Sequence, residues 1–197
     1  NSLQLSTNTK FEKQAGLSRN LGSLSIKGKP GTFFGSEGLM GSFAIEFWLC
    51  PSVSENGENI FTWESSKIEN DRLVYQMIDG TFKEGHLEWN ITNLFDIYTD
   101  DISNPKNLKD ITLKGTTNIV PDQWSYHSLS YDCESGILEY VVNGITEDLM
   151  YVTSTGTEQG QTFLVLLGTP SEVHFCKEYT GLIDDIRILR RPYSAPD

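Results

Sequence analysis

The segment formed by residues 124–151 constrains the fold of this 197-residue chain more than any other part of the sequence. In it, apolar and polar residues alternate in three short runs, which is the pattern of β-strands with one buried face. Turn-forming residues 132–136 separate the first two runs, and Asn143-Gly144 separates the next two. Asn-Gly between apolar runs favours a tight hairpin, because both residues tolerate positive φ. The segment therefore predicts a three-stranded antiparallel meander.

The same alternation recurs along the rest of the chain, and helical periodicity is nearly absent. The composition, with 38% hydrophobic and 11% aromatic residues and 17 glycines, is that of a folded and turn-rich protein. About eleven short strands at this spacing predict an all-β sandwich or barrel, and a chain of this length fits in one such domain. The expected strands are residues 23–27, 42–50, 59–64, 72–78, 86–91, 111–114, 123–131, 137–142, 146–151, 163–167 and 181–189.

The charge balance limits the classes of partner that the protein is expected to bind. The chain carries 15 basic and 27 acidic residues, a formal net charge of −12 at pH 7. Such a surface repels phosphate backbones and anionic lipid, which argues against a nucleic-acid or membrane-surface role. The sequence contains no run of about 18 apolar residues, so no membrane insertion is expected. Divalent cations, neutral sugars and basic protein patches all stay compatible with this charge.

Four segments resemble, in order, the strand motifs of one family. They are residues 42–51 (SFAIEFWLCP), 124–144 (WSYHSLSYDCESGILEYVVNG), 167–168 (LG) and 179–189 (YTGLIDDIRIL). Together they are similar to the laminin-G-like, concanavalin-A-like lectin and glucanase jelly-roll family. The resemblance implies a single two-sheet antiparallel jelly-roll domain over residues 1–197, with residues 1–41 matching least. It also implies a secreted, cell-surface or periplasmic location, and the chain itself begins at Asn1 with no leader-like segment.

One departure from the family motif concerns histidine. The family often places a histidine two residues after the first tryptophan of the second segment, where this chain has Tyr126, and His127 follows it. Alternation puts His127 on the same side as Leu129 and Tyr131. We therefore expect a structural histidine at the edge of the core.

Carbohydrate binding without catalysis is the function that the resemblance favours. Aromatic rings stack on the apolar faces of sugars, and amide and carboxylate groups bind the hydroxyls. Alternation also allows Trp63 and Trp89 to face the core, which would leave the polar residues of the strand at 86–91 on the opposite face. The predicted ligand-binding residues are Trp63, Tyr75, Gln76, His86, Glu88, Asn90 and Tyr98.

Calcium is the cofactor that the resemblance suggests. This hard cation takes about six to eight oxygen ligands from carboxylates and carbonyls. Asp100 and Asp101 lie in the longest polar interruption of the chain, and Asp184-Asp185 lies in the last expected strand. Adjacent strand residues point to opposite faces, so the last two carboxylates do not chelate one ion together. The predicted metal ligands are Asp100, Asp101 and Asp184.

Catalysis is not expected. The paired carboxylates of glycoside hydrolases, the Gly-x-Ser-x-Gly elbow and the P-loop and dinucleotide motifs are absent from the sequence. Glu46, Glu64 and Glu88 occupy polar positions of successive expected strands, which keeps a glycoside hydrolase of the same fold as a third hypothesis. The second hypothesis is a protein-binding or structural adhesin module of a larger surface protein.

Overall fold

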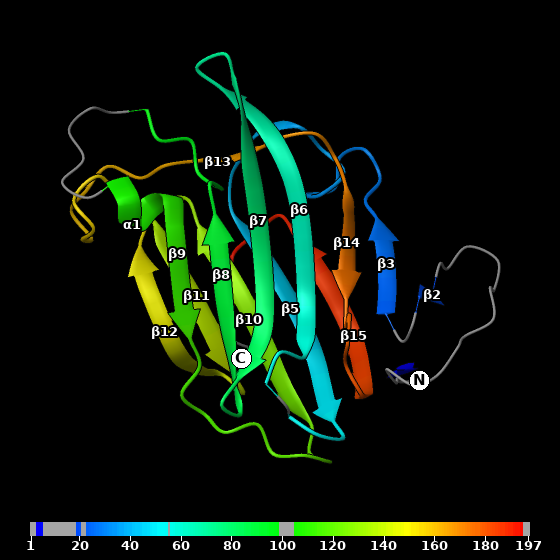
Figure 1. Cartoon of the computed structure of the whole chain (residues 1–197). Coiled ribbons are helices and arrows are strands. Elements are labelled where there is room, and N and C mark those ends of the chain that lie inside the picture. The colour runs from blue at the N-terminus through cyan, green and yellow to red at the C-terminus, as the bar shows by residue number, and fades with distance from the viewer. Residues whose placement is uncertain (1–2, 6–18, 21–22, 55, 99–104, 195–197) are drawn as a thin grey trace.

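The structure, a computed structural model, describes residues 3–5, 19–20, 23–54, 56–98 and 105–194, and its strands form two large antiparallel sheets that face each other across the core (Figure 1). Within these ranges the predicted all-β jelly-roll sandwich is confirmed. The six-stranded sheet contains, in spatial order, β1 (Leu3–Leu5), β15 (Gly181–Leu189), β5 (Phe43–Pro51), β10 (Ser125–Asp132), β11 (Ile137–Val142) and β12 (Ile145–Tyr151).

The other strands form the second sheet and a small ribbon. The ribbon pairs β13 (Val165–Leu167) with β4 (Gly38–Met40), and the one helix of the described residues is α1 (Pro105–Lys109). The seven-stranded sheet contains, in spatial order, β2 (Arg19–Asn20), β3 (Ser23–Lys27), β14 (Glu172–Phe175), β6 (Asn59–Glu69), β7 (Arg72–Lys83), β8 (His86–Thr92) and β9 (Asp110–Lys114).

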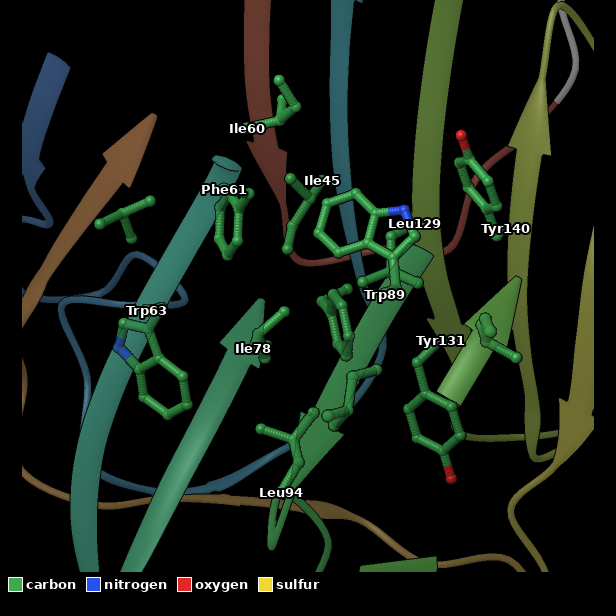
Figure 2. Packing of buried hydrophobic residues seen from close by; sticks show 14 of the residues in the cluster. Ile45, Ile60, Phe61, Trp63, Ile78, Trp89, Leu94, Leu129, Tyr131 and Tyr140 are labelled. Carbon is green, nitrogen blue, oxygen red and sulfur yellow. The ribbon is translucent and has the colours of Figure 1, made fainter. Parts of the chain in front are cut away.

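Alternation decides which side chains fill the space between the sheets. Along β5, Phe43, Ile45, Phe47 and Leu49 are all fully buried, because every second residue of a strand points to the same face. The facing sheet contributes large rings in the same way, and Figure 2 shows Trp63 and Trp89 among the packed core residues. Burial of such rings is the main favourable contribution to the stability of the sandwich.

The predicted meander is confirmed. β10 pairs with β11 and β11 with β12, all antiparallel. Asn143 and Gly144 have φ values of 50° and 78°, the left-handed conformation that a tight primed turn needs. His127 is buried beside Leu129 and Tyr131, as alternation predicts.

The structure departs from the expected elements in two ways. β6 and β7 run further than predicted, and their hairpin, with Asn70 and Asp71 at positive φ, projects beyond the other strands (Figure 1). The extended part was missed because Ile68 and Leu73 are exposed there and Lys67 is buried, which reverses the usual alternation. Five short elements, β1, β2, β4, β14 and α1, were also missed, since each is too short to show a period. No helix among the described residues is long and apolar enough to cross a membrane.

Candidate functional site

Two of the predicted ligand-binding residues, Trp63 and Gln76, lie in the core. Trp63 is 1% exposed and Gln76 is 0% exposed. The Gln76 amide nitrogen donates to the carbonyls of Asn93 (2.9 Å) and Leu166 (2.6 Å), and its amide oxygen accepts from the Gly168 backbone N–H (2.8 Å). A buried ring and an amide whose bonds go to the backbone offer no surface to a ligand. For these two residues the prediction was wrong, because both occupy inward positions of their strands.

Tyr75 and Tyr98 are exposed, and their hydroxyls bind different partners. The Tyr75 hydroxyl donates to a carboxylate oxygen of Glu64 (2.7 Å), and burial together with this bond raises the pKa of Tyr75 to about 12. The Tyr98 hydroxyl donates to the Thr162 carbonyl (3.1 Å), and its ring packs against Phe163 with centroids 5.3 Å apart. Each ring is therefore accessible without forming part of a shared aromatic surface.

His86, Glu88 and Asn90 lie on the outer face of the seven-stranded sheet, opposite the core-facing Leu87, Trp89 and Ile91. His86 and Glu88 line a cavity of about 530 Å³, and Lys83 holds the Glu88 carboxylate at 2.8 Å. The other residues that line this cavity are charged, amide-bearing or glycine, namely Asn56, Lys83, Glu84, Lys114 and Gly115. The cavity offers hydrogen bonds but no indole or phenol ring on which a sugar would stack.

Of the three predicted metal ligands, Asp184 lies within the described residues. Asp100 and Asp101 lie outside the described residues. Asp184 lies on β15, and its carboxylate accepts the backbone N–H of Asp185 (2.8 Å). Among the described residues, no group of three or more histidines, cysteines and acids is placed to hold a metal ion. Calcium binding therefore stays a prediction that Asp184 alone does not support.

A second hollow lies on the outer face of the six-stranded sheet, and we call it the Trp48 cleft. It has a volume of about 660 Å³. Its floor comes from outward positions of three adjacent strands: Trp48 pairs across the sheet with Tyr126, and Glu46 pairs with Arg187. The residues that line it are Glu46, Trp48, Tyr126, Asn143, Gly144, Asp185, Arg187, Arg191, Tyr193 and Ser194.

Three aromatic rings line the cleft. The Trp48 indole is 39% exposed, and its centroid lies 5.3 Å from that of Tyr126, with the two planes tilted by 53°. The ring centroid of Tyr193, in the segment after β15, lies 6.3 Å from that of Tyr126. Trp48 and Tyr126 are thus held on strands and all three rings lie near one another, while the indole stays partly open to solvent.

The polar groups of the cleft are tied to its rings and to each other. Glu46 is only 5% exposed, and burial together with a hydrogen bond to Glu46 raises the pKa of Tyr126 far above its ordinary value. The Arg187 guanidinium binds the Asp185 carboxylate through Nε (3.0 Å) and through a terminal nitrogen (2.9 Å). The register of β15 shifts between Asp184 and Arg187, and Asp185 has a φ of 48°. This irregularity accompanies the placement of Asp185 and Arg187 together at the cleft.

Asn143 joins the hairpin turn to the cleft. Its side-chain oxygen accepts the Tyr126 backbone N–H (2.8 Å), and the Asn143 backbone N–H donates to the Tyr126 carbonyl (2.8 Å). The same residue that gives the turn its left-handed conformation therefore anchors the strand that carries a cleft ring. The cleft combines stacking surface, carboxylates, a guanidinium and an amide in one place.

Sequence reasoning did not nominate this cleft, although part of its signal is present. Phe47 and Leu49 face inward, so the tryptophan between them must face outward, which is unusual for so large an apolar residue. Tyr126 occupies the matching outward position beside His127. An aromatic residue at a polar position of an alternating strand is a readable signal, and it points to both rings.

No protein-family model matches the sequence, and no curated protein matches it at the sequence level. Solved structures do match the fold. The CBM40 domain of the Ruminococcus gnavus IT-sialidase, bound to α2,3-sialyllactose, has a TM-score of 0.53 at 12% identity, over 98% of this chain and 91% of that one. Domains LG4-5 of the mouse laminin α1 chain have a TM-score of 0.51 at 11% identity, over 88% of this chain and 42% of theirs.

A candidate carbohydrate-binding protein of Bacteroides ovatus gives a TM-score of 0.50 at 13% identity, over 87% of this chain and 42% of that protein. The chain thus spans less than half the length of the laminin and Bacteroides chains. At these identities the likeness concerns the fold, and it agrees with the two-sheet topology described above. The chain has the laminin-G-like, concanavalin-A-like jelly-roll fold.

Proposed function

We propose that this chain, a domain of the laminin-G-like jelly-roll fold, is a non-catalytic carbohydrate-binding domain whose site is the Trp48 cleft. The observation that carries the proposal is the partly exposed Trp48 indole beside the nearly buried Glu46 carboxylate on the same strand. Sugar binding requires an aromatic face for the C–H groups of the ring and fixed polar groups for the hydroxyls. The cleft supplies both, and the fold is shared with domains that bind glycans.

The placement of the cleft on three hydrogen-bonded strands supports binding rather than a chance hollow. Trp48, Tyr126 and Arg187 are fixed by the register of β5, β10 and β15. A site whose side chains are already held in place loses little conformational entropy when a ligand binds. A strand-borne site therefore suits a sugar, which offers few strong contacts and gains affinity from preorganisation.

The distribution of carboxylates supports a role without catalysis. Glycoside hydrolysis needs two carboxyl groups that flank one bond. Glu64 and Glu88 lie on the outer face of the seven-stranded sheet, so the core separates them from Glu46. Within the cleft, Glu46 is bonded to Tyr126, and Asp185 is held by Arg187. With these partners, the Glu46 and Asp185 carboxylates are suited to accept hydrogen bonds and not to donate the proton that glycoside hydrolysis needs.

A secreted or cell-surface setting is part of the proposal, because such a domain meets glycans outside the cytoplasm. The test is a glycan microarray probed with the folded protein in calcium and in EDTA, beside the Trp48→Ala and Tyr75→Ala variants. We expect glycans that bind wild type and Tyr75→Ala but not Trp48→Ala. An array that stays blank in both buffers contradicts the proposal, and a protein ligand captured equally well after glycan removal favours the adhesin hypothesis. Signals that require calcium would support the predicted metal ion.

A further inference from the structure

We infer that the binding surface continues past Trp48 and takes a neutral oligosaccharide chain of at least two sugar units, a specificity that rests on the proposed glycan-binding function. A second hollow of about 240 Å³ borders the cleft, and its lining residues are Trp48, Trp124 and Asp184. Trp48 lines both hollows. One indole therefore stands between two adjoining spaces on the same outer sheet face.

The strand register explains why the two hollows adjoin along one line. Asp184 pairs directly with Trp48 across β15 and β5, and Arg187 pairs with Glu46 further along the same two strands. Outward positions of a strand are two residues, about 7 Å, apart. Trp124 lies immediately before β10, two residues from Tyr126, and its side chain is exposed. Acidic and aromatic groups thus recur at a spacing of the order of one sugar unit.

Each hollow holds the same pair of groups. Beside Trp48, the larger hollow contains the Tyr126 ring and the Glu46 carboxylate, and the smaller hollow contains the Trp124 ring and the Asp184 carboxylate. Trp124 is 42% exposed, which is unusual for a tryptophan unless its surface is used. A repeated pairing of ring and acceptor matches a ligand that is itself a repeat, and a chain of linked sugars has this property.

The charges of the surface favour a neutral chain. The two hollows carry three carboxylates, those of Glu46, Asp184 and Asp185, and two guanidinium groups, those of Arg187 and Arg191. Asp185 already occupies two nitrogens of Arg187. A sugar carboxylate would therefore meet net negative charge on a protein whose formal charge is −12, and of the two guanidinium groups the one set among the strands, Arg187, is already held by Asp185.

The experiment uses linear mono-, di-, tri- and tetrasaccharides of the neutral series that gives the strongest microarray signal, with Kd measured by isothermal titration calorimetry. We expect wild type to bind the trisaccharide at least tenfold more tightly than the monosaccharide. Trp124→Ala should remove this gain and keep the monosaccharide affinity, whereas Trp48→Ala should lose binding of both. Tyr75→Ala, which removes an exposed ring on the other sheet, is the matched control and should behave as wild type.

Acrylamide quenching gives a second readout that does not depend on the Ala variants. Trp63 and Trp89 are buried, so Trp48 and Trp124 supply the accessible fluorescence. The trisaccharide should protect both exposed indoles, and Trp124→Phe should show the smaller protection of one. Equal affinity for all lengths, or an unchanged gain in Trp124→Ala, overturns the extended surface while Trp48-dependent binding still supports the proposed function. Tighter binding of the uronic-acid or sialylated counterpart overturns the neutral specificity, and a blank microarray overturns both proposals.

Discussion

The rings of Trp48 and Tyr126 occupy directly opposite positions of β5 and β10, with their centroids 5.3 Å apart. Tyr126 also forms the hydrogen bond to Glu46, two residues before Trp48 on the same strand. One tyrosine therefore supports the stacking surface through its ring and the acidic acceptor through its hydroxyl. The two parts of the cleft are separable by substitution, because ring and hydroxyl can be removed independently.

Trp48→Ala removes the stacking surface, and we expect it to weaken glycan binding most. Truncation of a central aromatic residue of a binding site costs about 2 kcal/mol or more, which is roughly a 30-fold rise in Kd. Stability should change little, because Trp48 is already partly exposed. Calorimetric titration with the best microarray ligand measures the effect. A Kd within twofold of wild type would place the site elsewhere, and the Tyr75→Ala control then shows whether the opposite sheet binds.

Tyr126→Phe keeps the ring and removes the hydroxyl that is bonded to Glu46. Glu46 is nearly buried, and leaving a buried charged acceptor short of a partner costs about 1–3 kcal/mol. We therefore expect the free energy of unfolding, measured by urea titration at pH 7, to fall by about that amount. Tyr98→Phe, which removes an exposed hydroxyl bonded to the Thr162 carbonyl, is the matched control and should cost less. Equal losses in the two variants would mean that the Glu46 contact adds nothing to stability.

Gln76→Ala tests whether Gln76 stabilises the core and does not bind a ligand. The substitution leaves the carbonyls of Asn93 and Leu166 and the Gly168 N–H without their partner, and it opens a cavity. We expect the free energy of unfolding to fall by about 3 kcal/mol, from lost hydrogen bonds and lost packing. Glycan affinity of the folded protein should stay unchanged at a temperature well below the midpoint. A loss of affinity without a loss of stability would restore Gln76 to the binding site.

The core could be predicted from the sequence because it depends on a local property. Alternation within one strand tells which residues face inward, and it correctly places Trp89 and His127. The same rule assigns Trp63 to the core, so its nomination as a ligand residue set its chemistry above its position. The position of Trp63 in its strand, and not the chemistry of its side chain, determines its burial.

The candidate site was harder to predict because it joins residues that are distant in the sequence. The pairing of Trp48 with Tyr126 depends on which strands are neighbours, and the contact between Asp185 and Arg187 depends on an irregularity in β15. Neither strand order nor a register shift leaves a local period in the sequence. Only the outward parity of each aromatic residue was readable beforehand.

His127 should make the stability of the fold depend on pH. Burial lowers the pKa of His127 to about 3, against the weaker opposing effect of Glu147, and the ring is bonded to Ser125 Oγ (2.7 Å) and Tyr140 Oη (2.8 Å). In the unfolded chain the pKa is about 6.5. The contribution of the neutral His127 ring to the free energy of unfolding is therefore full above about pH 6.5 and is lost as the pH falls toward 3.

The size of this effect is up to about 5 kcal/mol at the acid end, since each unit of pKa difference is worth about 1.4 kcal/mol. Urea unfolding of wild type and His127→Phe at pH 7, 5 and 4 measures it. The variant should be less stable at pH 7 and should show a shallower decline with acid. His86→Gln, at a partly exposed histidine, should keep the wild-type slope. Titration of the His127 ring near pH 6.5 in an NMR experiment would contradict the prediction.

Glu147 connects the two sheets at one edge of the sandwich. It lies on β12, an edge strand of the six-stranded sheet, and binds the segment that follows β9, an edge strand of the seven-stranded sheet. Its carboxylate accepts the backbone N–H groups and hydroxyls of Thr116 and Thr117, and distances include 2.7 Å to the Thr117 nitrogen and 2.9 Å to the Thr116 hydroxyl. Burial alone would raise the pKa of Glu147, but these four bonds outweigh it and lower the pKa. The stabilisation that the ionised Glu147 carboxylate gives to the folded state is therefore full above the ordinary glutamate pKa. It is lost as the pH falls through the lower pKa of the folded state.

Glu147→Gln should release this edge at neutral pH as well, because a neutral amide cannot accept all four bonds. We expect at least tenfold faster hydrogen exchange at the Thr116 and Thr117 amides and a fall of about 1–2 kcal/mol in the free energy of unfolding. NMR-detected exchange at pH 7 measures the local effect, and Glu158→Gln, at an exposed loop carboxylate, is the matched control. If both amides exchange at the wild-type rate in Glu147→Gln, the edges of the two sheets are joined by other contacts, such as the 2.9 Å bond from the Lys114 N–H to Asp148.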